Sequence, residues 1–261
     1  MKIPFSKYHG TGNDFIIIDN RLIHWKPTIQ QVSFLCNRHF GIGSDGLMLL
    51  SDKPGFDFFM SYYNSDGNES TMCGNGGRCM TAFAKTLGLV SYRANFWAVD
   101  GCHEAEISEN PSENIYRIKM RDTRIEKIYD DGFFLNTGSP HFVRFVNDAT
   151  NTDVFNFGGE LRRDVRFAPE GTNVDFVEVQ DVSLFVRSYE RGVENETLSC
   201  GTGVTASAIV AAFINPANPG FYDIKTLGGV LKVSFTRTGE LFSEIWLEGP
   251  AKFVFAGEIN I

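Results

Sequence analysis

The sequence predicts an α/β (α+β) protein made of two pseudo-symmetric lobes that arose by internal duplication. Two short segments, Met72-Cys73-Gly74-Asn75-Gly76-Gly77 and Ser199-Cys200-Gly201-Thr202-Gly203-Val204, are near copies of each other at an offset of 127 positions. Strand signals dominate the rest of the chain, and an apolar helical pattern follows each cysteine. A repeat of this length points to two similar strand-rich lobes, each around one helix, that face each other across a cleft. Each lobe then contributes one cysteine to an active site in that cleft.

Further matches extend the duplication beyond the cysteine segments. The same offset relates three more pairs of identical residues: Tyr62 with Tyr189, Glu69 with Glu196, and Ala84 with Ala211. A chain of 261 residues is long enough for two domains that each bury a core. We place the boundary near residue 121, so that residues 1–120 form the N-terminal lobe and residues 121–250 the C-terminal lobe. The last strand, near residues 251–261, is expected to pack in the N-terminal lobe.

Strands are predicted wherever apolar residues run continuously or alternate with polar ones over a short stretch. These segments are residues 15–19, 47–50, 56–63, 115–120, 141–146, 174–179, 184–189, 230–235 and 241–247. Thr28 followed by Gln31 has the pattern of a capping box and predicts a helix that ends near Asn37.

A helix is also predicted after each of the two matched cysteines. Apolar residues from Met80 to Leu87 recur at i, i+3, i+4 and i+7, which predicts one buried face and an end at Gly88. Residues 204–214 are almost all apolar, so the helix after Cys200 should be enclosed on all sides.

Composition restricts the possible functions. A formal net charge of −8 argues against nucleic acid as a partner, because neutralising phosphates needs a basic face. No apolar run approaches the roughly 20 residues of a membrane span, and the N-terminus lacks a signal-peptide pattern, so we expect a cytoplasmic protein without a membrane partner. The 5 cysteines are an odd number at irregular spacing, which indicates free thiols.

Cys73 and Cys200 carry the strongest chemical signal. A thiol at a helix N-terminus meets free backbone N–H groups and the positive end of the helix dipole, which favour the thiolate. The glycines beside each cysteine let a ligand carboxylate approach those N–H groups. Two such thiols on opposite faces of one alpha carbon could remove a proton from one side and deliver one from the other, which inverts that carbon. Such a site needs no pyridoxal cofactor.

Other interpretations of the cysteines and polar loops stay open at this point. Cys36, Cys79 and Cys102 are expected to be structural, as most lone cysteines are. Five residues separate Cys73 from Cys79, which does not fit the short spacing of a zinc site, so we predict no metal. A reversible disulfide between the two matched cysteines would instead make the protein a redox-sensing binder. Asn64 could be only a turn former, and Glu190-Arg191 only an exposed ion pair.

The chain resembles the diaminopimelate epimerases along nearly its whole length. Seven blocks carry the resemblance, in order: His9-Gly10-Thr11-Gly12-Asn13-Asp14-Phe15, Asn64-Ser65-Asp66-Gly67, Cys73-Gly74-Asn75-Gly76-Gly77-Arg78-Cys79, Pro140-His141, Asn173-Val174, Tyr189-Glu190-Arg191-Gly192 and Cys200-Gly201-Thr202-Gly203. The resemblance implies lobes built as curved mixed sheets around a central helix, a homodimer, and cofactor-independent epimerisation of LL-2,6-diaminopimelate to the meso form for lysine and peptidoglycan precursor synthesis.

The resemblance also assigns roles to individual residues. Cys73 and Cys200 are the acid–base pair, with His141 and Glu190 tuning the thiols and the nearby amine. The remaining implied contacts are with a small amino-acid substrate: Gly74, Asn75, Gly201 and Thr202 bind the reacting carboxylate, and Asn13, Asn64, Asn173, Glu190 and Arg191 hold the rest.

Two positions depart from the family pattern, and related activities remain as alternatives. Ser139 stands where an asparagine often precedes Pro-His, and Gly46 where a glutamine often follows Gly-x-Gly-x-Asp. The main alternative is a racemase or epimerase of proline or hydroxyproline. Such an enzyme does not need Asn64, Asn173 and Glu190-Arg191 for a second amino-acid head group. The phenazine-type isomerases do not use the cysteine pair.

Overall fold

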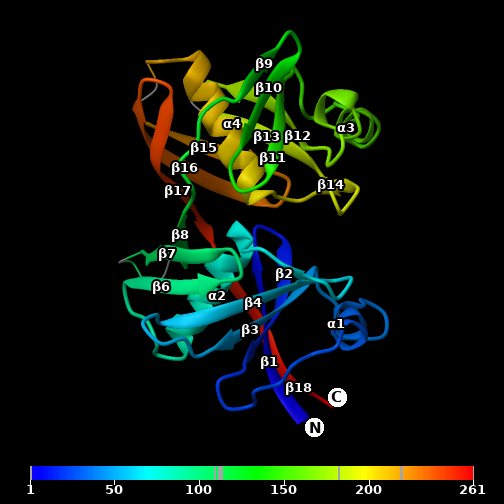
Figure 1. Cartoon of the computed structure of the whole chain (residues 1–261), viewed down its shortest axis with the longest axis vertical. Coiled ribbons are helices and arrows are strands. Elements are labelled where there is room, and N and C mark those ends of the chain that lie inside the picture. The colour runs from blue at the N-terminus through cyan, green and yellow to red at the C-terminus, as the bar shows by residue number, and fades with distance from the viewer. Residues whose placement is uncertain (1, 109, 111–113, 182, 218–219, 261) are drawn as a thin grey trace. The chain divides into compact units, whose positions relative to one another are not determined.

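The computed structural model describes residues 2–108, 110, 114–181, 183–217 and 220–260 (Figure 1). The chain forms two compact units, one of residues 1–118 with 249–261 and one of residues 119–248. Each unit combines a mixed sheet with a few helices, which confirms the predicted fold class.

The first unit contains a sheet in which antiparallel and parallel pairs alternate. Its strands are β1 (Lys2–Gly10), β2 (Asn13–Asp19), β3 (Gly46–Ser51), β4 (Phe58–Asn64), β5 (Glu69–Ser70), β6 (Arg93–Ala98), β7 (Gly101–Ile107), β8 (Ile115–Lys119) and β18 (Lys252–Asn260). The pairing order is β18, β1, β2, β3, β4, β6, β7 and β8, with β5 forming a short hairpin on β4. The β2–β3 and β4–β6 pairs are parallel. Its helices are α1 (Ile29–Cys36) and α2 (Gly74–Thr86).

The second unit repeats this plan. Its strands are β9 (Lys127–Tyr129), β10 (Gly132–Asn136), β11 (Pro140–Phe145), β12 (Asn173–Gln180), β13 (Ser183–Glu190), β14 (Asn195–Thr197), β15 (Phe221–Thr226), β16 (Gly229–Thr238) and β17 (Leu241–Pro250). The pairing order is β9, β10, β11, β12, β13, β15, β16 and β17, with β14 on β13, and the β11–β12 and β13–β15 pairs are parallel. The helices are α3 (Val154–Arg162), a 3-10 turn η1 (Val165–Phe167) and α4 (Gly201–Ile214).

The correspondence between the units is strand for strand, with one exception. In the second unit, β10 pairs with β9, which directly precedes it in the chain. In the first unit the equivalent strand β1 pairs with β18, which comes from the far end of the chain. Figure 1 shows this pairing as the red final strand beside the blue first strand, with both ends of the chain together.

The helix that follows each matched cysteine lies in the interior of its unit. In α4 every residue from Gly203 to Ala212 is buried, as the apolar sequence predicts. In α2 every residue from Gly74 to Ala84 is buried too, so the prediction of a single buried face was wrong. The buried residues outside the predicted face include the polar Asn75, Arg78 and Thr81, which a periodicity of apolar residues assigns to solvent. Figure 1 shows the strands of the second unit curving around α4.

Capping and turn signals locate the local structure well. Thr28 accepts a hydrogen bond from the Gln31 N–H, the Gln31 side chain accepts one from the Thr28 N–H, and α1 is capped by Asn37. The two residues of the β1–β2 loop, Thr11 and Gly12, have φ of 49° and 86°, as a type I′ hairpin turn requires.

Several elements give little signal in the sequence. β1 begins Lys-Ile-Pro, and α3 contains Gly158-Gly159 in its interior, which lowers its helix propensity. Gly158 is needed there, because a Cβ at this position would lie 2.5 Å from the Cβ of Tyr189.

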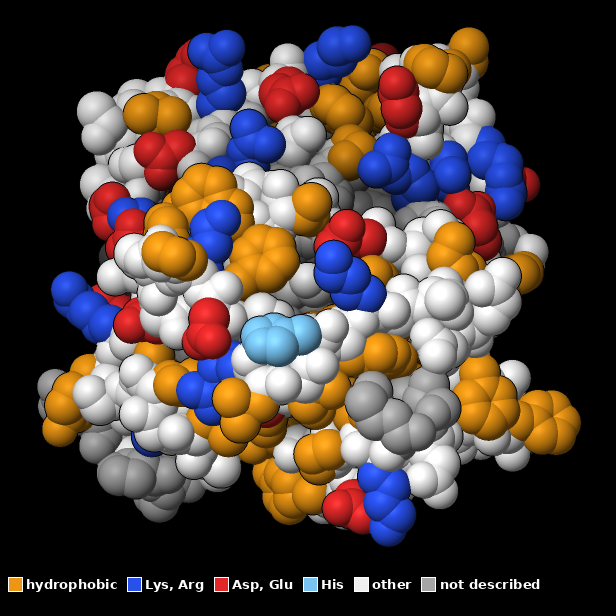
Figure 2. Space-filling view, turned by 60° about the horizontal axis from the view of Figure 1, so that its bottom comes forward, with side chains coloured by type: hydrophobic (Ala, Val, Ile, Leu, Met, Phe, Trp, Pro, Cys, Tyr) orange, Lys and Arg blue, Asp and Glu red, His pale blue; other side chains and the backbone are white. Residues whose placement is uncertain are grey.

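The surface and the cysteines agree with most of the sequence interpretation. All 5 cysteines are free thiols, as predicted, but Cys102 is exposed on β7 and is not the buried residue we expected. The reason is that alternate residues of β7 face away from the core, and Cys102 is one of them. Among the described residues, no helix is long and apolar enough to cross a membrane. Acidic and basic side chains are interspersed on the face shown in Figure 2.

Candidate active site

Cys200 is the N-cap residue of α4, as the sequence predicts, and only 5% of it is exposed. Its Sγ lies 3.5 Å from the Thr202 hydroxyl. Burial raises the pKa of the Cys200 thiol well above its ordinary value, and the carboxyls of Glu190 and Asp175 raise it further, although the Thr202 hydroxyl and the Gly203 N–H oppose them. The helix dipole therefore does not decide the state of this thiol, which is protonated at neutral pH.

His141 links that thiol to a buried carboxylate. His141 and Asp175 are fully buried, and His141 Nδ1 lies 2.7 Å from Asp175 Oδ2. Because a carboxylate only accepts, Nδ1 donates to Asp175, and Nε2 lies 2.9 Å from Thr202 Oγ1 and 3.2 Å from Asn173 Nδ2. Ser188 donates to the other Asp175 oxygen at 2.6 Å. The His141 ring is thus fixed in one orientation.

Glu190 and Arg191 stand at the end of β13, beside this network. Thr197 donates to the Glu190 carboxyl, and burial raises the pKa of Glu190 against the effect of hydrogen bonds from Thr197 and Cys200. The Arg191 N–H donates to Asn173 Oδ1 at 2.8 Å, so Asn173 holds the turn that presents both charged residues. Cys200, Thr202, His141, Asn173 and Glu190 are therefore brought together within the second unit.

Gly203 makes this arrangement possible. A Cβ at position 203 would lie 2.3 Å from Asp175 Oδ1. Only glycine allows the Asp175 carboxylate to sit against the first turn of α4. Thr137 adds a second link, because its hydroxyl donates to the Thr202 backbone carbonyl at 2.8 Å.

The first unit places Cys73 at the equivalent position, as the N-cap residue of α2. Cys73 is partly exposed, and its Sγ lies 3.8 Å from Asn13 Oδ1. The same oxygen accepts from Asn75 Nδ2 at 3.3 Å, and Asn13 Nδ2 donates to Asp45 Oδ2 at 2.7 Å. Asn13, Cys73 and Asn75 therefore form one polar cluster.

Asn64 lies at the same end of this sheet as Asn13. It ends β4 and pairs with Gly46, which in turn pairs with Phe15. Gly46 is required by packing, since a Cβ there would lie 2.5 Å from Tyr62 Cε2 and 2.7 Å from the Tyr63 carbonyl oxygen. Tyr62 thus occupies the space into which a longer residue at position 46 would project.

An ion-pair network supports the cluster from outside. Arg38 contacts Asp14 and Asp45, each at 2.7 Å, and Lys7 Nζ lies 2.7 Å from Asp14. Burial opposes ionisation of Asp14, but hydrogen bonds from Arg38 and Lys7 outweigh it and lower its pKa to about 2. The loop that carries Asp45 is therefore fixed against the Asn13 turn.

Sequence reasoning missed several residues of both half-sites. Asp175 and Ser188 are the main ones in the second unit, and Asp45 and Arg78 in the first. Asp175 had a weak signal, because it is an acid between Val174 and Phe176 in the apolar first part of the segment Asn173–Gln180. Among the described residues, no cluster of His, Cys, Asp or Glu side chains could hold a metal ion.

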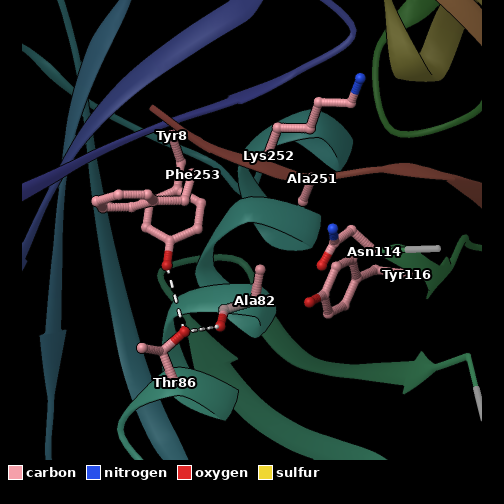
Figure 3. A pocket seen from close by; sticks show the side chains of 8 residues that line it. All are labelled: Tyr8, Ala82, Thr86, Asn114, Tyr116, Ala251, Lys252 and Phe253. Atoms are coloured by element: carbon pink, nitrogen blue, oxygen red, sulfur yellow. Dashed lines mark hydrogen bonds between the residues drawn. The ribbon is translucent and has the colours of Figure 1, made fainter. Parts of the chain in front are cut away.

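A separate cavity of about 320 Å³ lies in the first unit (Figure 3). Its lining residues are Tyr8, Ala82, Thr86, Asn114, Tyr116, Ala251, Lys252 and Phe253. The Tyr8 hydroxyl lies 3.3 Å from the Thr86 hydroxyl, which donates to the Ala82 carbonyl at 3.1 Å. The cavity holds none of the predicted site residues, so it is distinct from the Cys73 half-site.

Comparison with known proteins decides the family of the chain. The family model described as diaminopimelate epimerase matches residues 5–121 and 133–254. The chain belongs to the diaminopimelate epimerase family. It is 49% identical to the diaminopimelate epimerase of Flavobacterium psychrophilum over 251 aligned residues. This alignment covers 95% of this chain and 97% of that protein. It is 40% identical to that of Chlorobaculum tepidum, over 97% of this chain and 99% of the relative.

Solved structures show that the epimerase fold is shared more widely. A phenazine biosynthesis protein of the PhzF family from Bacillus anthracis has a TM-score of 0.73 at 15% identity and covers 100% of both chains. A probable proline racemase from Agrobacterium radiobacter has a TM-score of 0.75 at 14% identity, over 99% of this chain and 93% of that one. These likenesses concern the fold alone.

Proposed function

We propose that this member of the diaminopimelate epimerase family converts LL-2,6-diaminopimelate to the meso form without a cofactor, for lysine and peptidoglycan precursor synthesis. The observation that supports the proposal best is the pair of cysteines at equivalent N-cap positions of α2 and α4, each within its own polar cluster. Family membership supports the substrate. This pathway also leads us to expect a cytoplasmic location, which cell fractionation would test.

In the proposed reaction the two cysteines act on opposite faces of one alpha carbon. With the LL isomer, the Cys73 thiolate removes the alpha proton and the Cys200 thiol delivers a proton from the other side. The negative charge that develops on the substrate is stabilised by backbone N–H groups of the two helix N-termini, at Gly74 and Asn75 and at Gly201 and Thr202. For the reverse direction the two residues exchange roles.

The surroundings of Cys200 suit it to the role of proton donor at rest. Its thiol is buried beside two carboxyls, which keeps it protonated. The hydrogen-bonded series from Thr202 through His141 to Asp175 fixes the Thr202 hydroxyl beside the sulfur. Glu190 and Arg191 offer a carboxylate and a guanidinium to the amino and carboxylate groups of the substrate, together with Asn13, Asn64 and Asn173.

Proton NMR in deuterated water tests the reaction directly. The reduced protein is mixed with LL-diaminopimelate and no cofactor, and loss of the alpha-proton signal is followed together with appearance of the meso isomer. Cys73→Ser and Cys200→Ser should each lower turnover by several powers of ten while circular dichroism stays unchanged. Activity like that of the wild type in either variant would contradict the two-base mechanism.

Proline is the control substrate, because proteins with this fold include a probable proline racemase and a hydroxyproline epimerase. Exchange of the proline alpha proton, without exchange of diaminopimelate, would replace the proposed substrate. Lack of exchange with both, in a protein that still binds one of them, would favour a non-catalytic binder.

We also propose that the protein is a homodimer that uses β18. Among the described strands, β18 pairs only with β1, and Phe253, Val254 and Phe255 on it are 57%, 50% and 44% exposed. An unpaired edge with large apolar side chains is a typical surface for association. Sedimentation velocity should give twice the mass of the chain, and Val254→Glu should give monomers. Leu22→Glu, at a position that is 92% exposed elsewhere in the unit, is the matched control.

A further inference from the structure

Arg78 is a fully buried cation without an anionic partner. It lies on α2, one turn after Cys73, and its side chain is 0% exposed. Among the described residues, no carboxylate is within ion-pair distance of the guanidinium, and its Nε is the one buried side-chain nitrogen or oxygen without a hydrogen-bond partner. Burial lowers its pKa to about 10, so it is charged at neutral pH. An unpaired buried charge is rare in folded proteins and calls for a counterion.

The other charges of this region are already matched. On β1 and β2, Lys7 pairs with Asp14, which also binds Arg38, and Arg38 binds Asp45. These two cations and two carboxylates balance, which leaves the Arg78 charge in excess. His9 on β1 adds no charge at neutral pH, because burial lowers its pKa.

The remaining titratable groups packed against α2 do not supply the anion. On β7, His103 contacts Asp100, which accepts the Met72 N–H but is 31% exposed. Burial raises the pKa of the Tyr8 phenol on β1 and of the Tyr116 phenol on β8, so both stay neutral.

Two thiols remain as candidates for the counterion. Burial raises the pKa of the Cys79 thiol far above its usual range, so Cys79 is neutral. Cys73 is partly exposed, stands at the helix N-terminus, and interacts electrostatically with the Arg78 guanidinium. Of the two thiols, Cys73 is therefore the candidate for the counterion of Arg78.

Arg78 also fixes the cluster around Cys73 by direct contacts. Its Nη2 donates to Asn75 Oδ1 at 2.7 Å, and Nη1 lies 3.4 Å from the Gly74 carbonyl oxygen. Asn75 then donates to Asn13 Oδ1, which also accepts from the Cys73 thiol, in its protonated form, at 3.8 Å. The guanidinium thus orients the first turn of α2 from behind.

The second half-site lacks this cation. The position equivalent to Arg78 in the duplication is Thr205, a buried neutral residue that donates to the Gly201 carbonyl at 2.9 Å. Around Cys200 the nearby charges are the carboxyls of Glu190 and Asp175, which disfavour a thiolate. The two half-sites therefore share a backbone plan and differ in the sign of their electrostatics.

We propose that Arg78 is a positioning residue that stabilises Cys73 as the thiolate and holds Asn75 and Asn13 around it. The free protein then carries its proton on Cys200 and its negative charge on Cys73. The assignment of Cys73 as the base rests on the proposed function, but the charge state of its sulfur does not.

The pH dependence of alkylation measures that charge state without any substrate. The protein is treated with iodoacetamide over a pH series, and modification of the Cys73 and Cys200 peptides is quantified by mass spectrometry. In the wild-type protein Cys73 should react with a midpoint below that of a free thiol, about pH 8.5, and Cys200 with one above it. A Cys73 midpoint at or above 8.5 would overturn the proposal without any variant.

Substitutions then separate the charge from the packing. Arg78→Met should move the Cys73 midpoint upward by at least about one pH unit, a tenfold loss of thiolate in the acidic range. Arg78→Lys should keep most of the effect, because the charge is retained. Thr81→Val, which removes a buried hydroxyl that donates to the Gly77 carbonyl on the same helix, should leave the midpoint unchanged. Equal shifts in all three variants would mean that only the helix structure matters and would refute the electrostatic role.

The kinetic readout distinguishes this proposal from the proposed function. If diaminopimelate is a substrate, the acidic limb of the kcat/KM profile moves to higher pH in Arg78→Met along with the alkylation midpoint. If the wild-type protein exchanges no diaminopimelate proton, the proposed function fails, and the alkylation midpoints still decide the role of Arg78.

Discussion

Replacing Gly203 by alanine should damage the second unit, whereas the same change at Gly76 should not. The two glycines occupy the third position of α4 and α2 and correspond to each other in the duplication. A Cβ at Gly203 would lie 2.3 Å from Asp175 Oδ1 and 3.1 Å from Ser188 Oγ. A Cβ at Gly76 would meet the flexible ends of Met48 and Met60, with Met48 Sδ nearest at 3.1 Å, and would lie at ordinary contact distance, 3.6 Å, from Phe15 Cζ.

The expected cost follows from the bonds that Asp175 must give up. Its carboxylate accepts from His141 at 2.7 Å and from Ser188 at 2.6 Å, all in the interior. A hydrogen bond to a charged group contributes about 1.5–3 kcal/mol, and an alanine in a helix returns about 1 kcal/mol relative to glycine. Gly203→Ala should therefore lower the free energy of unfolding by about 3 kcal/mol, and Gly76→Ala should leave it within about 1 kcal/mol of the wild type.

Thermal unfolding measures both variants without any assumption about the substrate. For a chain of this size about 3 kcal/mol corresponds to a fall of roughly 10 °C in Tm. Trp246 lies in the second unit, and Trp25 and Trp97 lie in the first. Fluorescence of single-tryptophan versions therefore assigns the loss to a unit. Equal Tm values for the two alanine variants would refute the reasoning, and so would a loss confined to the first unit.

Three further predictions follow from individual environments. Glu190→Gln should lower the pH midpoint of Cys200 alkylation, because the Glu190 carboxyl helps to raise the pKa of that thiol; an upward shift would contradict this. Asp14, with a pKa of about 2 against the ordinary 3.8, contributes stability that is complete above about pH 4 and lost as the pH falls through about 2. Asp14→Asn should therefore destabilise the protein at neutral pH. Its urea unfolding midpoint should also change less between pH 4 and pH 2 than that of the wild type. An equal change in the two proteins would be inconsistent with the ion pairs. Gly46→Gln should prevent stable folding, since its Cβ would lie 2.5 Å from the Tyr62 ring, and a soluble variant with the Tm of the wild type would show that the strand accommodates it.

Much of the fold could be predicted because the signals were local. The cysteine segments, the capping box at Thr28 and the strands with continuous apolar residues each depend on a few neighbouring residues. A last strand was expected in the N-terminal lobe, and β18 does pair with β1, but this strand has no comparable local signal because its pairing joins Asn260 to Lys2 and most of its side chains are exposed.

The polar networks of the half-sites were harder to predict than the cysteines. Arginine is almost never fully buried, so nothing in the sequence places Arg78 in the interior. Its burial depends on strands that close over the polar side of α2. The state of Cys200 could not be predicted either, because Glu190 and Asp175 reach it from strands that are not adjacent to it in sequence.

The position of β18 has a consequence for synthesis. Residues 119–248 form the second unit as one continuous segment, so this unit can fold as soon as it has left the ribosome. The first unit is made earlier, but the free edge of β1 has no partner until the last residues of the chain appear. Until then β1 is an open strand that can pair with other chains. The half of the protein that is translated first is thus completed last, and a ribosome that stalls before residue 252 releases an aggregation-prone product.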